Sequence, residues 1–512
     1  MGPGRVHVSS RKAWFAASGI LVLAALARLP YLWSVPSFAV EWEEILRAAT
    51  AATTHVYPAT NVAHDIGPVF IYLQGFLFQV FGTNLLLPRV VALAAGALAA
   101  LFAYLSGREA AGERVGLLAG GVVAFSGAAI MLSHQAFSNT LTPLAVTAAG
   151  LVTMMAERRH RYLLVPAGVL WGLALQTDTS VLAMLVPLFA YLVWRATRRG
   201  WLVPALAGIG GFVLGYANMI AYNVQTNLGS LTWILEKKKY AFSHPTGVLP
   251  VLEHYAFEAG EWGQTLGSGF LTTNLLQDAW AVVAVLACLT AYVMAVRHAL
   301  REREWGSELL LALGVGPLLV IPLFNQAYNY PIAARYLLPA LPFAVILIGR
   351  WLKDIWPRLK ARRRRLATLA VALLAFVGPM VATIGYESGQ TAAMAANAVG
   401  LGLADKAYAL DPSTKAVVLF DSRGYLARWY PNILRTEGFT VYLMGDPWAS
   451  GERGVFTQAA WERAITKAHS TTIAVLAPAD YAALAPLVPA GARVVRQAGP
   501  GRYVIVYLPA LR

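Results

Sequence analysis

Ionisable side chains gather in one short stretch, residues 40–68, directly after the first long apolar run of the chain. The stretch holds three carboxylates, then two imidazoles and a fourth carboxylate: Glu41, Glu43, Glu44, His55, His64 and Asp65. Such groups exchange protons readily, and they are costly to desolvate at a bilayer surface, so a cluster there indicates a function. Residues 40–68 are therefore the first candidate for acid–base chemistry.

The spacing of apolar residues in this stretch predicts a short amphipathic helix that lies in the membrane interface. Its apolar face is formed by residues at helical intervals: Trp42, Ile45, Leu46 and Ala49. Glu43 and Arg47 are four residues apart, which suits an ordinary ion pair on a solvated helix. That structural role is the alternative to a catalytic one.

The composition is that of a polytopic membrane protein. Of 512 residues, 58% are hydrophobic and only 13% are charged, whereas soluble domains carry about a quarter charged residues. The formal net charge of +15 comes from short basic clusters between apolar runs, which argues against a nucleic-acid groove. Cys288 is the single cysteine and lies in an apolar run, so no intrachain disulfide can form.

Eleven apolar runs are long enough to be predicted as membrane spans, the first of them uncleaved. They are residues 14–33, 87–106, 115–132, 140–156, 162–176, 179–194, 202–222, 279–296, 307–324, 336–351 and 366–384. Residues 68–81 are also apolar but shorter, and contain two glutamines. We interpret them as an interfacial or re-entrant helix, because an extra span would invert all later loops.

The arginine clusters then predict an orientation in the plasma membrane. With the N-terminus cytoplasmic, every dense cluster falls on the cytoplasmic side, as the positive-inside rule requires. The clusters lie at residues 108–114, 158–161, 195–199, 297–303 and 350–365. The opposite, extracytoplasmic surface is then formed by the opening stretch, residues 133–139, 177–178, 223–278 and 325–335.

After residue 385 the pattern changes to short β-like runs alternating with helical ones. The predicted strands are residues 416–420, 439–443, 472–476 and 503–508, and the predicted helices are 424–436, 458–468 and 480–487. This order predicts a membrane domain at residues 1–385 and a small extracytoplasmic α/β domain at 386–512.

Several short motifs follow one another in an order typical of one family. They are Trp42-Glu43-Glu44, Gly67-Pro68-Val69-Phe70-Ile71-Tyr72, Phe81-Gly82, Leu87-Pro88-Arg89, Tyr104-Leu105-Ser106-Gly107-Arg108, Arg114-Val115-Gly116-Leu117-Leu118-Ala119 and Arg335-Tyr336-Leu337-Leu338-Pro339. In these the chain resembles the integral-membrane glycosyltransferases of the C-type fold, which include protein O-mannosyltransferases and the lipid A aminoarabinose transferase. More narrowly, it is similar to the bacterial branch with a rhizobial-lipopolysaccharide-type transferase domain.

The resemblance implies transfer of a sugar from a polyprenyl-phosphate donor to an acceptor hydroxyl of a lipid, glycan or protein on the extracytoplasmic face. Glu43 matches the family's acidic residue, which implies that it is the general base, with Glu44 as its neighbour. Arg335 and Tyr336 match the arginine–tyrosine motif, which implies a cation for the departing lipid phosphate. The alternative role for Arg335 is to anchor a helix end near lipid headgroups.

The chain departs from the family at Asn139, where relatives often carry a second aspartate. An amide can position a sugar hydroxyl but cannot act as a base. Either Glu43 acts alone, or His64-Asp65 or Asp178 substitutes, or catalysis is reduced. His64, Asp65, His134 and Asn139 are the candidates for positioning sugar or acceptor.

Two features of the outer loops have open interpretations. No tight ligand spacing connects the histidines and carboxylates, so no cofactor is certain, and a divalent metal is only an option. Lys237 and Lys238 lie in a predicted outer loop and so break the positive-inside pattern. They form either a solvated basic face or a site that captures the donor phosphate.

Two rival functions fit the same composition. One is a carrier or flippase for a lipid-linked glycan, although carriers tend to place charges mid-span, whereas the charges of this chain crowd the outer loops. The other is a relative that binds a lipid-linked sugar without catalysis, which Asn139 would explain.

Overall fold

The computed structural model describes residues 10–383 apart from short gaps, together with five strands beyond them. The gaps are at residues 31, 33–38, 62, 83–85, 242–247, 268–274, 303–304, 325–333, 374–375, 377 and 382. Contacts divide the chain into two units, which we describe separately. The first comprises Met1–Leu32, Tyr57–Gln74 and Leu85–Glu387, and the second Trp33–Val56, Gly75–Asn84 and Ser388–Arg512.

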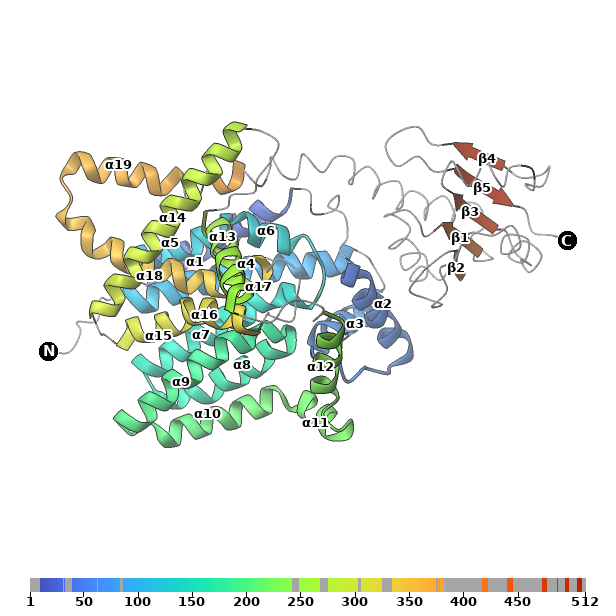
Figure 1. Ribbon diagram of the computed structural model, residues 1–512, viewed down its shortest axis with the longest axis horizontal. Helices are drawn as coiled ribbons and strands as arrows, with labels where there is room; N and C mark the ends of the chain where they lie inside the picture. The colour runs from blue at the N-terminus through green and yellow to red at the C-terminus, as the bar shows by residue number, and fades with distance from the viewer. Residues whose placement is uncertain are drawn as a thin grey trace. The chain divides into compact units, whose positions relative to one another are not determined.

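Before residue 383 the described elements are helical, as the apolar runs predict. They are α1 (Ser10–Arg28), α2 (Ala39–Thr54), α3 (Val69–Phe81), α4 (Leu86–Ala111), α5 (Glu113–Phe125), α6 (Gly127–Ser133), α7 (Thr142–Arg158), α8 (Leu164–Thr177), α9 (Leu182–Arg199), α10 (Leu202–Gly215), α11 (Ala217–Gln225), α12 (Gly229–Ala241), α13 (Val248–Gly267), α14 (Leu275–Glu302), α15 (Trp305–Gly314), α16 (Gly316–Phe324), α17 (Ala334–Leu337), α18 (Leu341–Ile355) and α19 (Ala361–Ala372). Figure 1 shows these helices along the chain.

The protein is a multi-pass membrane protein. Among the described residues, six helices are long and apolar enough to cross a bilayer, or eight if each of two bent pairs forms one span. The prediction of eleven spans remains a prediction. Helix α8, for example, has only 14 residues and is not among these candidate spans. Helix α3 has 13 residues, or about 20 Å, against a hydrocarbon core of about 30 Å. Its length agrees with the predicted interfacial or re-entrant role.

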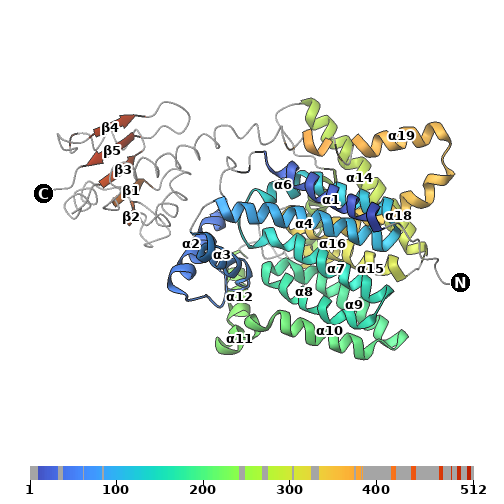
Figure 2. The ribbon, with the colours of Figure 1, turned by 180° about the vertical axis from the view of Figure 1, so that it is seen from behind.

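Small residues allow the helices of the first unit to pack closely. Helix α4 packs against α1, α5 and α7, and α18 packs against α5, α14 and α15, as both ribbon views show (Figures 1 and 2). Helices α8 and α10 approach through glycines: a Cβ on Gly172 would lie only 2.5 Å from the carbonyl oxygen of Phe212. Such contacts are typical of helix pairs in membranes, where close packing replaces the hydrophobic effect.

The predicted span at residues 115–132 is broken in two. Helices α5 and α6 meet at a bend of 56°. The bend frees backbone carbonyls of α5, and the buried guanidinium of Arg28 donates to the carbonyls of Val123, at 3.1 Å, and Ala124, at 2.9 Å. A buried charge is tolerated here because the backbone of the broken helix supplies its acceptors.

The second unit includes a five-stranded mixed sheet with the order β2-β1-β3-β5-β4. The strands are β1 (Val417–Asp421), β2 (Thr440–Met444), β3 (Thr472–Leu476), β4 (Arg493–Arg496) and β5 (Val504–Leu508). Strand β1 pairs in parallel with β2 and β3, whereas β5 is antiparallel to β3 and β4. Four strands lie where the β-like runs predict them. The three predicted helices, and with them the α/β architecture, lie outside the described residues.

Candidate active site

The arginine-rich loops lie at one end of the helices of the first unit. At the C-terminal end of α4, Arg158 donates to the carbonyl of Ala110 at 2.7 Å, and Arg159 pairs with Glu109 at 2.5 Å. Helices α7, α9 and α18 carry Arg158, Arg195 and Arg350 near their C-terminal ends. The N-terminal ends of these three helices are therefore the opposite face of the bundle, about 25 Å away at 1.5 Å per residue.

At that opposite face, Asn139 and Asp178 are paired. Asn139 lies in the 3₁₀ turn that precedes α7, and its amide donates to Oδ2 of Asp178. Asp178 caps the 3₁₀ turn Thr179–Val181 that precedes α9, and its Oδ1 accepts from the backbone N–H of Ser180 at 2.7 Å. The two turns thus bring the amide of Asn139 against the carboxylate of Asp178.

Asp65 reaches the same place from the opening stretch. Its Oδ2 accepts a hydrogen bond from the hydroxyl of Thr179 at 3.3 Å. The turn that carries it is fixed to α8, because the N–H of Gly67 donates to the carbonyl of Gln176 at 2.8 Å. A Cβ on Gly67 would lie 2.6 Å from Cβ of Gln176, so this close approach requires glycine. Asp65 and Asp178 are both buried.

Arg335 supplies a positive charge close to Asp178. It lies on α17, and its guanidinium donates to the hydroxyl of Tyr336 at 2.7 Å. The guanidinium carbon also lies over two aromatic rings, 4.7 Å from the centre of Tyr336 and 5.9 Å from that of Phe137. Aromatic faces orient a guanidinium by stacking and by cation–π attraction. This arrangement suits a bidentate anion such as a phosphate.

Burial raises the pKa of Asp178 above its ordinary value, and the charge of Asp65 raises it further. The hydrogen bonds from Ser180 and the charge of Arg335 act in the opposite direction. Because burial is the largest of these effects, Asp178 holds a proton to a higher pH than an exposed aspartate does. A carboxylate of this kind, beside a cation and a second carboxylate, is suited to proton transfer.

His64 contacts residues of the turn before α3 and of helices α11 and α12. Its Nδ1 lies 3.1 Å from the hydroxyl of Tyr222 and 3.4 Å from that of Thr60. Its ring meets the edge of Trp233, with 4.9 Å between centres, and its backbone carbonyl accepts from Ser230 at 2.8 Å. The turn that carries His64 is therefore packed against α11 and α12.

The remaining predicted residues lie elsewhere or outside the described side chains. His134 is buried, and its Nε2 lies 2.9 Å from the carbonyl oxygen of Arg28, where α1 ends. Glu44 is buried on α2, the helix predicted from the opening stretch. The side chains of Glu43, Lys237 and Lys238, on α2 and α12, lie outside those described, so their predicted roles remain predictions.

Sequence reasoning missed Thr179, Phe137 and Tyr222, and it named Asp178 only as a substitute. The sequence signal for Asp178 is its position, alone in a two-residue turn between two apolar runs. Among the described residues, the only group of three metal-ligating side chains is His298, Glu302 and Asp354, at the other end of the bundle.

Comparisons with known proteins agree on the fold. Residues 65–220 match the family described as dolichyl-phosphate-mannose-protein mannosyltransferase. ArnT from Cupriavidus metallidurans, bound to undecaprenyl phosphate, aligns over 98% of both chains with a TM-score of 0.63 and 14% identity. The Archaeoglobus fulgidus oligosaccharyltransferase in its apo form aligns over 91% of this chain and 70% of its own, with a TM-score of 0.56 and 12% identity.

A second structure from Archaeoglobus fulgidus, AglB in complex with an inhibitory peptide and a dolichol-phosphate, aligns with a TM-score of 0.52 and 14% identity. It covers 91% of this chain and 70% of its own. A search of curated protein sequences finds no match. The chain therefore has the fold of these glycosyltransferases, and the expected C-type fold is confirmed.

Proposed function

We propose that this chain, on its C-type glycosyltransferase fold, transfers a sugar from a polyprenyl-phosphate donor to an acceptor hydroxyl. The observation that carries the proposal is the cluster of Arg335 and Tyr336 with Asp65 and Asp178 at one end of the bundle. It combines a cation for a phosphate with carboxylates for hydroxyl groups. Of the structures with this fold, one is bound to undecaprenyl phosphate and one to a dolichol-phosphate.

In the proposed reaction, the acceptor oxygen attacks the anomeric carbon of the sugar. The bond from that carbon to the phosphate oxygen breaks, and the lipid phosphate departs against Arg335 and Tyr336, with Lys237 and Lys238 as further cations. A carboxylate, Glu43 beside Glu44, takes the acceptor proton. Asp65, His64 and Asn139 position the sugar or acceptor hydroxyls.

A turnover assay tests the function. The purified protein in lipid is expected to release undecaprenyl phosphate from an undecaprenyl-phosphate-linked sugar when an acceptor with a free hydroxyl is present. A panel of sugars and acceptors is needed because the substrates are not identified. Movement of the intact donor between leaflets, without release of the phosphate, would instead support a carrier.

We also propose that the N-terminus is cytoplasmic and that the domain at residues 386–512 is extracytoplasmic. The arginine loops, which share one end of the bundle, support this orientation. In a Cys288→Ala background, a thiol introduced at Ser450 is expected to react with a membrane-impermeant reagent in intact cells. One at Ser10 is expected to react only after permeabilisation, and the reverse pattern would contradict the orientation.

A further inference from the structure

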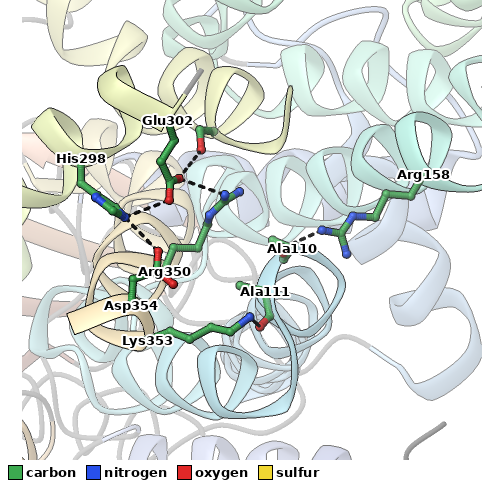
Figure 3. Close-up of polar contacts among 9 residues, drawn as sticks. Ala110, Ala111, Arg158, His298, Glu302, Arg350, Lys353 and Asp354 are labelled. Atoms are coloured by element: carbon green, nitrogen blue, oxygen red, sulfur yellow. Dashed lines mark hydrogen bonds and ion pairs between the residues drawn. The ribbon is translucent and has the colours of Figure 1, made fainter. Parts of the chain in front are cut away.

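Three metal-ligating side chains converge at the end of the bundle that carries the arginine loops. His298 and Glu302 are one turn apart on α14, so they share a face of that helix. Asp354 comes from the last turn of α18, which packs against α14. Figure 3 shows the three side chains pointing at one another. They are far from Asp178 and Arg335, and the proposed transfer reaction makes no use of them.

The ligand atoms of this group face one another at short distances. Nε2 of His298 lies 3.0 Å from Oε1 of Glu302 and 2.9 Å from Oδ2 of Asp354. One ring nitrogen carries either one proton or one lone pair. A single ring nitrogen therefore faces two carboxylate oxygens at once, as ligand atoms do around one metal ion. Arg350 offsets part of the charge of Glu302, and an ion between the three ligand atoms would offset the rest.

The spacing suits a small divalent ion. The three ligand atoms lie within 4.8 Å of one another. Ligands about 2.0–2.2 Å from a tetrahedral zinc ion are about 3.3–3.6 Å apart, so small rotations of these side chains would complete the sphere. One imidazole with two carboxylates is a ligand set that zinc accepts, with a fourth position for water.

Neighbouring groups hold the carboxylates in place for an ion. The second oxygen of Glu302, Oε2, accepts from Arg350 and from the hydroxyl of Ser307, each at 3.2 Å, which leaves Oε1 facing His298. Lys353 donates to the carbonyl of Ala111 at 3.1 Å, and it is directed toward α4 (Figure 3). The side chains of His298, Glu302 and Asp354 are 29%, 23% and 39% exposed, so an ion can enter from solvent.

We propose that His298, Glu302 and Asp354 bind a divalent transition-metal ion, with zinc as the best fit, and that the ion clamps α14 to α18. Arg350 and Ser307 are the outer partners that orient Glu302. The proposed role of the site is structural, because it joins the two helices at the C-terminal end of α18. Arg335 lies beyond the other end of that helix. It does not depend on the proposed sugar transfer.

Metal titration of the tag-free, chelator-treated protein in lipid tests the site. Co²⁺ is expected to bind with one-to-one stoichiometry, to give the visible absorption of a tetrahedral site, and to be displaced by Zn²⁺. The variants His298→Asn, Glu302→Gln and Asp354→Asn are each expected to lose at least about a hundredfold in affinity, and Ser307→Ala about tenfold. His160→Asn removes an exposed histidine outside the site and should leave binding unchanged.

Thermal unfolding gives a second measurement that does not depend on activity. Zn²⁺ is expected to raise the unfolding temperature of the wild-type protein and of His160→Asn, because an ion that binds only the folded state stabilises it. The three ligand variants, if folded, should show no such rise. Absent binding, or binding that the ligand variants retain, would overturn the site and leave His298 as a hydrogen-bonded bridge between the two carboxylates.

Discussion

Arg335→Ala is expected to lower the rate of sugar transfer by about a hundred- to a thousandfold, the typical cost of removing one preorganised donor from a developing anion. The structure explains why one side chain should matter so much. Tyr336 and the ring of Phe137 hold the guanidinium in one orientation, so its positive charge has a fixed place in the site. Turnover with a polyprenyl-phosphate sugar measures the loss.

Arg335→Lys distinguishes phosphate recognition from helix anchoring. Lysine keeps the charge but not the planar pair of donors, so its activity should lie between the wild type and Arg335→Ala. Arg159→Lys is the matched control, because Arg159 pairs with Glu109 on the bundle surface at the other end. Near-wild-type turnover in both Arg335 variants would reduce this residue to a helix anchor.

Much of the fold follows from hydropathy and charge alone. The apolar runs place most helices, and the arginine clusters correctly group loops that the structure brings to one end of the bundle. The bends at α5/α6 and α10/α11, of 56° and 66°, were not predicted. Hydropathy does not reveal such breaks. Arg28 donates to backbone carbonyls of α5, and every residue type has a backbone carbonyl.

The site is only partly visible in the sequence. His64, Asp65 and Arg335 stand out as ionisable groups next to apolar runs. The pairing of Asn139 with Asp178 does not, because it joins turns before two different helices and depends on how α7 and α9 pack. Strand β4 was missed because Arg493 and Arg496 flank only two apolar residues, and its pairing with β5 defines it.

Glu43→Gln is the most consequential change on the opening stretch. Glutamine keeps size and hydrogen bonding but cannot take a proton, so a general-base role predicts a loss of about a hundred- to ten-thousandfold in rate. Binding of undecaprenyl phosphate should persist, because Arg335 and Tyr336 are unchanged. If Glu43 only pairs with Arg47, the loss is about 0.3–0.5 kcal/mol of helix stability, and Glu43→Gln should behave like Arg47→Gln.

Asp178→Asn tests the rival base under the same assay. Burial raises the pKa of Asp178, which makes it a stronger base once ionised, although it is ionised in a smaller fraction of molecules. If Glu43 is the base, Asp178→Asn should weaken sugar binding more than the chemical step, which appears as a larger change in KM than in kcat. An active Glu43→Gln enzyme beside an Asp178→Asn enzyme whose kcat has collapsed would transfer the base assignment to Asp178. In that case the amide of Asn139, which donates to this carboxylate, would serve to orient the base.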